Sequence, residues 1–103
     1  IIGETTQDFI NQFRMDFGII GISGIEENGA LLDFDYREVR VAQAIIKNSR
    51  NVLLAADHSK FGRYAMVRLG NITQANNFIT DAQPPESILT LLKEHDVTLH
   101  LAH

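Results

Sequence analysis

The chain has 103 residues, of which 45% are hydrophobic and 21% are charged, and its formal net charge at pH 7 is −4. This globular composition suffices for one domain, and the acidic balance argues against bulk electrostatic binding of DNA or an anionic membrane. The absence of cysteine excludes disulfides and thiolate metal sites and fits a reducing, cytoplasmic compartment. The sequence has no apolar run near the ~18 residues that span a bilayer and no signal-peptide layout at its N-terminus.

Three segments predict helices. Thr6 is expected to cap a first helix whose apolar face includes Phe9. Asp35 and Glu38 resemble a capping box, and the apolar periodicity behind them predicts a second helix. Pro85 suits the first turn of a third helix.

Four apolar runs predict strands between these helices. Residues 17–22 and 52–56 end in turn signals, which is typical of buried strands, and residues 77–80 and 97–101 predict two shorter strands. Short apolar strands that alternate with helices indicate an α/β fold with a mainly parallel sheet and helices on both faces. Because ligands bind at the carboxyl ends of such strands, the loops after the first two strands are the expected place for a site.

The charges are distributed unevenly along the chain. Residues 58–80 contain no Asp or Glu but include Lys60, Arg63 and Arg68. Lysine binds a phosphate as a point charge and arginine binds it bidentately, so this segment predicts an anion site; a solvated basic loop explains it equally well. Lys60 is expected to be the main cation for a phosphoryl group, with no neighbouring carboxylate to pair with it.

Glycines surround a serine after the first predicted strand. The sequence Gly21-Ile22-Ser23-Gly24 would let a ligand approach the backbone closely, since glycine has no side chain in the way. It lacks the spacing of a dinucleotide fingerprint or a P-loop, and an ordinary tight turn is the favoured interpretation.

Three acids gather at the start of the second predicted helix. Asp33, Asp35 and Glu38 have carboxylates that suit sugar hydroxyls or general-base chemistry. Acids at a helix N-terminus also complement the helix dipole, and capping is the favoured explanation for Asp35. For Glu38 the two explanations remain open.

Other residues give no sign of a cofactor or of nucleophilic catalysis. The four histidines show no metal-ligand spacing, so neither a metal nor a cofactor is expected. Ser23 and Ser59 lack a neighbouring His–Asp pattern, and no G-x-S-x-G elbow is present.

Three stretches together resemble one family. Residues 16–25 (DFGIIGISGI), 33–40 (DFDYREVR) and 56–63 (ADHSKFGR) are similar to the C-terminal effector domain of DeoR-type bacterial transcriptional regulators. The resemblance runs over nearly the whole chain, and the D-H-S-K-F-G run is its most specific element. It implies a fold shared with ribose-5-phosphate isomerase and glucosamine-6-phosphate deaminase, and sensing of glycerol 3-phosphate or a sugar phosphate.

The resemblance also implies what lies outside this sequence. Residues 1–103 would form the later part of a longer effector domain, because the family's domain begins before Ile1. The winged helix-turn-helix domain that binds DNA lies upstream and is absent here. DNA would therefore be bound only through that domain, no membrane is expected as a partner, and the protein would be a homo-oligomer.

Comparison with the related enzymes bears on catalysis. They carry an Asp-Gly-Ala-Asp motif where this chain has residues 21–24, and a downstream lysine where it has about Gly29. Glu38 matches their base and Lys60 matches a phosphate ligand, so binding groups persist while the acid–base set is broken. No catalytic residue is therefore expected. The ligand-binding residues expected from the sequence and the resemblance are Ser23, Gly24, Asp35, Glu38, Lys60 and Arg63.

Three hypotheses follow from the sequence. The leading one is an effector-sensing module of a transcriptional repressor. The second is an active sugar-phosphate isomerase or deaminase on the same fold. The third is an oligomerisation domain with a vestigial pocket.

Overall fold

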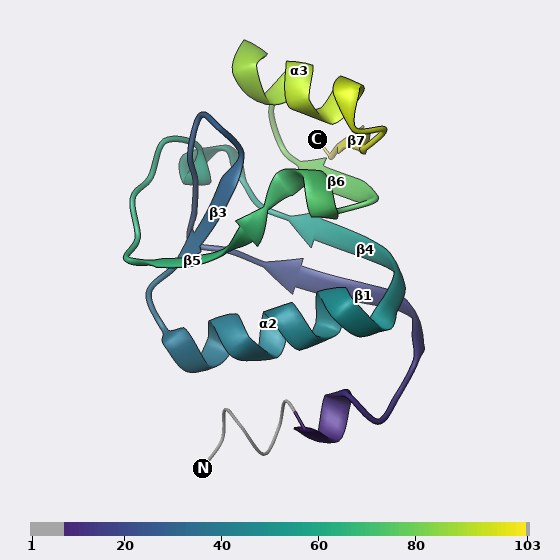
Figure 1. The fold of residues 1–103 in the computed structure, drawn as a ribbon. Coiled ribbons are helices and arrows are strands. Elements are labelled where there is room, and N and C mark those ends of the chain that lie inside the picture. Colours follow the sequence, from purple (N-terminus) through teal and green to yellow (C-terminus); the bar gives the residue numbers. More distant parts are fainter. Residues whose placement is uncertain (1–7, 103) are drawn as a thin grey trace.

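The computed structural model describes residues 8–102, which form two small sheets and two helices longer than one turn (Figure 1). Thr6, the predicted cap of the first helix, lies outside the described residues; residues 8–10 are helical. The elements, in chain order, are β1 (Met15–Gly21), β2 (Gly24–Ile25), β3 (Ala30–Asp33), α2 (Tyr36–Asn48), β4 (Ser49–Ala55), the 3₁₀ turn η1 (His58–Lys60), β5 (Val67–Asn71), the 3₁₀ turn η2 (Ile72–Gln74), β6 (Asn77–Thr80), α3 (Glu86–Glu94) and β7 (Thr98–Leu101).

The larger sheet is parallel and has the strand order β1-β4-β6-β7. Its four strands correspond to the four predicted from apolar runs, and β6 has the predicted bounds. The register aligns Gly21 with Ala55, Ala55 with Ile79, and Ile79 with His100. The strands therefore end together, and the chain leaves them along one edge of the sheet.

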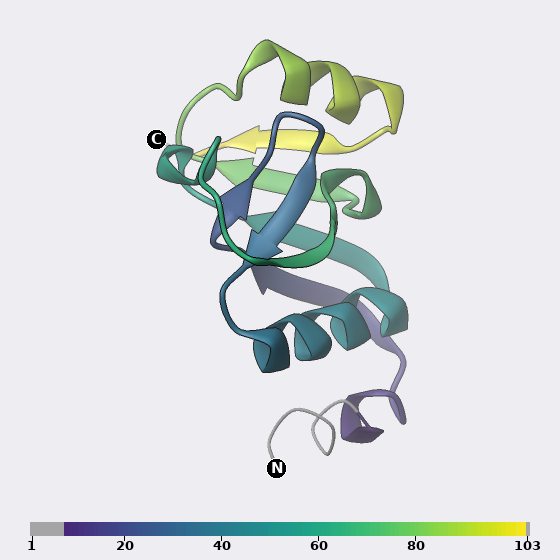
Figure 2. The same ribbon diagram turned by 60° about the vertical axis from the view of Figure 1, so that its left-hand side comes forward.

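A second, three-stranded antiparallel sheet has the order β2-β3-β5 and was not predicted. It lies in front of the parallel sheet in Figure 2. Its strands have two, four and five residues, and the pairing of β3 with β5 joins segments that are far apart in the sequence. Strands this short carry no usable period-two pattern, so only the tertiary fold defines them.

Helix α2 begins where the sequence predicts. The Asp35 side chain accepts a hydrogen bond from the Arg37 backbone N–H at 2.8 Å, which satisfies one of the unpaired donors at the helix start. Val39 and Ala44 are buried on the inner face, and Ile45 is partly buried there. An amphipathic helix of this kind is stabilised mainly by packing its apolar face.

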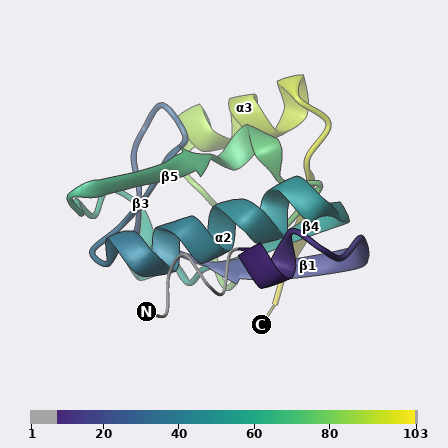
Figure 3. The same cartoon turned by 60° about the horizontal axis from the view of Figure 1, so that its bottom comes forward.

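All of these elements share one hydrophobic core. Phe78 and Leu54 from the parallel sheet are fully buried, and they cluster with Ile88 of α3, Val39 of α2 and Ile72 of η2. Figure 3 shows both helices and the small sheet on the same side of the parallel sheet. The main core therefore lies between the parallel sheet and the elements packed on it, and Ala30, Leu32 and Ala65 form a second, smaller cluster.

The prediction of a mainly parallel α/β sheet is confirmed, but the described residues cover only one of its faces. On the other face of β1, Phe17 is 71% exposed and Ile19 is 67% exposed. Strand side chains alternate between faces, so these two residues point away from Gly18 and Ile20, which are buried. Among residues 8–102, helices on both faces are therefore not found.

Candidate functional site

The loop after β4 is held in place by a cap at Asp57 and by two contacts of Phe61. Asp57 caps η1 by accepting a hydrogen bond from the Ser59 backbone N–H at 2.8 Å. Phe61 forms a parallel bridge with Ile25 of β2, and its ring packs edge-on against Phe78, with centroids 6.0 Å apart and planes at 86°. These contacts hold η1, and therefore Lys60, at the carboxyl edge of the parallel sheet.

Lys60 lines a hollow of about 370 Å³ at this edge. The floor comes from the last residues of β1, β4 and β6, as the register requires. The Lys60 side chain is 25% exposed, so most of it is covered and part of it remains accessible from solvent. The lining residues are Gly21, Ile22, Ala55, Ala56, Asp57, Lys60, Ile79, Thr80, Asp81 and Ala102.

The prediction that no carboxylate pairs with Lys60 is wrong. Asp57 Oδ2 lies 3.9 Å from Lys60 Nζ, because one turn of 3₁₀ helix brings residues three apart onto the same side. The acid-free segment 58–80 is bounded by Asp57 and Asp81, and the fold brings both acids to the hollow. The site is therefore a cation flanked by two carboxylates and not a uniformly positive surface.

His58 and Asp81 join the loops after β4 and β6. Asp81 accepts a hydrogen bond from the His58 backbone N–H at 2.7 Å, and its second oxygen lies 2.8 Å from His58 Nδ1. The hydrogen bond to Asp81 raises the pKa of His58 above its ordinary value. The same bond lowers the pKa of Asp81, and hydrogen bonds from Ser59 lower the pKa of Asp57. Both acids therefore stay ionised at neutral pH.

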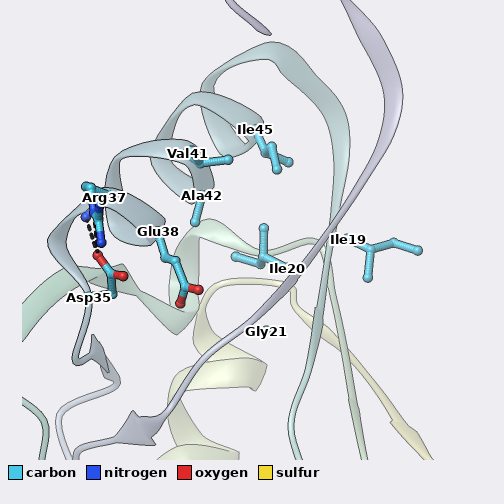
Figure 4. Close-up of a pocket in the computed structure, with 9 residues that line it drawn as sticks. All are labelled: Ile19, Ile20, Gly21, Asp35, Arg37, Glu38, Val41, Ala42 and Ile45. Carbon is cyan, nitrogen blue, oxygen red and sulfur yellow. Dashed lines mark hydrogen bonds and ion pairs between the residues drawn. The ribbon is translucent and has the colours of Figure 1, made fainter. Parts of the chain in front are cut away.

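A second cavity of about 370 Å³ lies between α2 and β1. Its walls are mostly apolar, and Figure 4 shows the Glu38 side chain extending from α2 toward β1. Asp35 lies at the rim, with Arg37 Nε 3.5 Å from its Oδ1. The hydrogen bond from the Arg37 backbone N–H is the largest cause that lowers the pKa of Asp35. Helix capping is thus the observed role of Asp35, whereas the Glu38 carboxylate faces the cavity.

Gly24 lies where two segments of the chain come close together. A side chain there would collide with the Arg63 backbone carbonyl, so the glycine allows two chain segments to cross. The Ser23 hydroxyl donates to Asp33 Oδ1 at 3.0 Å. Three other predicted residues line neither of the two cavities: Ser23, Gly24 and Arg63. Arg68 lies on β5 and is also outside both cavities.

The structure therefore brings three of the six predicted ligand-binding residues to two neighbouring cavities. Asp35 and Glu38 line the cavity beside α2, Lys60 lines the hollow at the sheet edge, and Gly21 lines both. Sequence reasoning missed Asp57, Thr80 and Asp81 as residues of the hollow, and it missed His58 as the partner of Asp81. The D-x-x-K spacing was a usable signal for Asp57; no local signal marked Thr80 or Asp81.

The two cavities contain groups whose chemistry suits the binding of a small ligand. A lysine ammonium attracts an anion, and carboxylates accept hydrogen bonds from hydroxyls. Within residues 8–102 no group of three side chains is placed to hold a metal ion. In the same part of the chain no helix has the length and apolarity to cross a bilayer.

Comparison with known proteins identifies the family. Residues 1–82 match the family described as the DeoR C-terminal sensor domain. The chain belongs to this family, so the resemblance noted from residues 16–25, 33–40 and 56–63 is confirmed. The expectation of a regulatory domain is confirmed with it, because the family is described as a sensor domain and the similar proteins are named as repressors.

Three relatives define the similarity more closely. The chain is 58% identical over 101 residues to the glycerol-3-phosphate regulon repressor of Escherichia coli, covering 98% of this chain and 40% of that protein. It is 53% identical over 103 residues to the protein of the same name from Haemophilus influenzae, covering 100% and 40%. It is 35% identical over 101 residues to the transcriptional repressor CsqR of E. coli, covering 98% and 39%. The chain thus spans about 40% of the length of these relatives.

Gly24→Ala is expected to lower the free energy of unfolding by about 1–3 kcal/mol, because the added methyl group is forced against the Arg63 backbone. Gly21→Ala is the matched control, since the nearest atom to its new Cβ is the Ala55 carbonyl oxygen at 3.9 Å. Urea denaturation of both variants measures the difference. Equal stability of the two variants would contradict the crossing of segments at Gly24.

Asp81→Asn is expected to lower the pKa of His58, because the hydrogen bond to the Asp81 carboxylate is the largest cause of its elevation. An NMR titration of the His58 ring protons measures the shift, with Asp16→Asn in β1 as the control. An unchanged His58 pKa in Asp81→Asn would show that the pair does not form.

The same pair sets the direction of a pH effect. A raised histidine pKa stabilises the fold below the ordinary histidine value, and this contribution is lost as pH rises through the raised value. A lowered aspartate pKa stabilises above the ordinary aspartate value, and this contribution is lost as pH falls through the lowered value. The link between the two loops is therefore strongest in mildly acidic solution. Both side chains are exposed, so its effect on global stability is small.

Proposed function

We propose that this chain is the metabolite-sensing part of a cytoplasmic transcriptional repressor, and that it binds glycerol 3-phosphate or a related sugar phosphate. The observation that carries the proposal is the 58% and 53% identity to two proteins named as glycerol-3-phosphate regulon repressors. Such identity over nearly the whole chain supports a shared ligand class. DNA would be bound by an upstream domain of the full-length protein.

The two cavities match the two ends of such a ligand. Lys60 supplies a cation for the phosphoryl group at the sheet edge, and Glu38 supplies an acceptor for hydroxyl groups beside α2. Gly21 lines both cavities, so a small ligand that lies across Gly21 reaches both groups. The ion pair between Lys60 and Asp57 is loose, at 3.9 Å, and a phosphoryl group replaces it at little cost.

Sensing requires that the ligand bind one conformation better than another. The loop that carries Lys60 is joined to the end of β6 through His58 and Asp81. Ligand contacts at Lys60 therefore act on two loops at once, and the DNA-binding domain would respond to the conformation that the ligand favours.

Lys60→Ala is expected to weaken binding of glycerol 3-phosphate to the full-length protein by roughly 10- to 150-fold, which is the usual range for loss of a charge-assisted contact. Folding should change little, since the residue lies in a loop at the surface. Calorimetric titration measures the affinity. Glycerol, which lacks the phosphate, should bind the unmutated protein far more weakly.

Lys93→Ala is the matched control, because Lys93 lies in the last turn of α3 and lines neither cavity. Equal affinity of Lys60→Ala and Lys93→Ala would place the phosphate elsewhere and leave the basic segment a solvated loop. A parent protein that binds neither glycerol 3-phosphate nor another sugar phosphate would end the sensing proposal.

Self-association is also part of the proposal. Phe17 and Ile19 place two large, exposed apolar side chains side by side on the open face of β1. Light scattering of the full-length protein should therefore give a mass greater than that of one chain, and Ile19→Asp should reduce it if this face forms the contact. A monodisperse monomer at high concentration would exclude the oligomer.

A further inference from the structure

Thr80 has an unusual environment for a polar residue. It is the last residue of β6 and is only 2% exposed. Its hydroxyl oxygen is buried and has no hydrogen-bond partner among the described residues. Because buried polar groups in folded proteins are nearly always hydrogen-bonded, an unpaired hydroxyl in a native structure requires an explanation.

The position of Thr80 supplies one. Its backbone lies in the row that follows the aligned residues Gly21, Ala55 and Ile79, and the residue lines the same hollow as Lys60. The residue with the unpaired hydroxyl thus lies at the edge of the sheet where the proposed function puts the phosphoryl group.

The other polar groups of the hollow are already engaged. The Asp57 carboxylate caps η1 and accepts from Ser59, and the Asp81 carboxylate binds the backbone and ring of His58. Lys60 has three donors and only a 3.9 Å contact with Asp57. The Thr80 hydroxyl and the Lys60 ammonium are therefore the side-chain donors of the hollow with capacity for a ligand.

We infer that Thr80 is a ligand-contacting residue whose hydroxyl donates a hydrogen bond to the phosphoryl group that Lys60 attracts; this inference rests on the proposed function. A hydroxyl adds direction to the point charge of a lysine, since its hydrogen bond requires a defined donor–acceptor angle. Because Thr80 is only 2% exposed, the residues that cover it must shift for the ligand to reach the hydroxyl, but no hydrogen bond of the hydroxyl has to break.

The inference predicts opposite effects on stability and affinity. Thr80→Val preserves the shape of the side chain and removes the hydroxyl. In the absence of ligand, its melting temperature should equal or exceed that of the parent, because an unpaired buried polar group has been removed. Binding of glycerol 3-phosphate should nevertheless weaken by about tenfold, the effect of one lost hydrogen bond to a charged acceptor.

The test is calorimetric titration of the full-length parent, Thr80→Val and Thr80→Ser with glycerol 3-phosphate and with inorganic phosphate, alongside thermal denaturation without ligand. Thr80→Ser retains the hydroxyl and should bind within a few-fold of the parent. Weaker binding of both probes to Thr80→Val alone supports the contact with the phosphoryl group.

Each other result has a distinct meaning. Parent-like binding by Thr80→Val, together with weak binding by Lys60→Ala, overturns the role of Thr80 and leaves the proposed function intact. A lower melting temperature with unchanged binding shows that the hydroxyl serves the fold, through a buried water for example, and also overturns the inference. If the parent binds neither probe and no other sugar phosphate, the proposed function and the role of Thr80 are removed together.

Discussion

The register of three parallel strands determines the shape of the sheet edge at which Lys60 lies. Gly21, Ala55 and Ile79 are aligned across β1, β4 and β6, so the chain leaves all three strands at one edge. Strand pairing of this kind is fixed by backbone hydrogen bonds and by the buried face, because a slip of one residue would turn Leu54 and Phe78 out of the core. The hollow at Lys60 is thus a consequence of core packing and not of the loops alone.

The loops then refine this edge. The Phe61 ring packs beside Phe78. Asp57 caps η1, the single 3₁₀ turn that lies between the end of β4 and Phe61. Lys60 is held between these two fixed points, which restricts the positions its ammonium can occupy. A flexible lysine gains in this way some of the preorganisation that a binding site needs.

Sequence reasoning succeeded where the signal was local. The four apolar runs became the four parallel strands, and Asp35 caps α2 as its spacing from Glu38 suggested. The small antiparallel sheet was missed because β3 and β5 are short, and because their pairing connects residues 30–33 with residues 67–71. Pairing between segments so far apart in the sequence depends on the whole fold, and neither segment carries a hydrophobic pattern that would predict it.

The site was predicted less completely than the fold, for related reasons. Lys60 was recognised from the charge distribution, but Asp57 lies one residue before the acid-free segment and Asp81 lies one residue after it. Because the prediction considered only the charges of residues 58–80, it left out the two aspartates that the fold brings to Lys60. A threonine at a strand end is equally unremarkable in sequence, since only tertiary packing shows that the Thr80 hydroxyl is buried and unpaired.

The edge-on contact of Phe61 with Phe78 has a consequence for how this domain can change over evolution. Phe61 follows Lys60 directly, while Phe78 is fully buried at the centre of the core. A substitution that reshapes the core around Phe78 therefore displaces the residue next to Lys60. Under the proposed function, the stability of the core and the position of the phosphate-binding lysine depend on the same aromatic pair, so neither can change independently of the other.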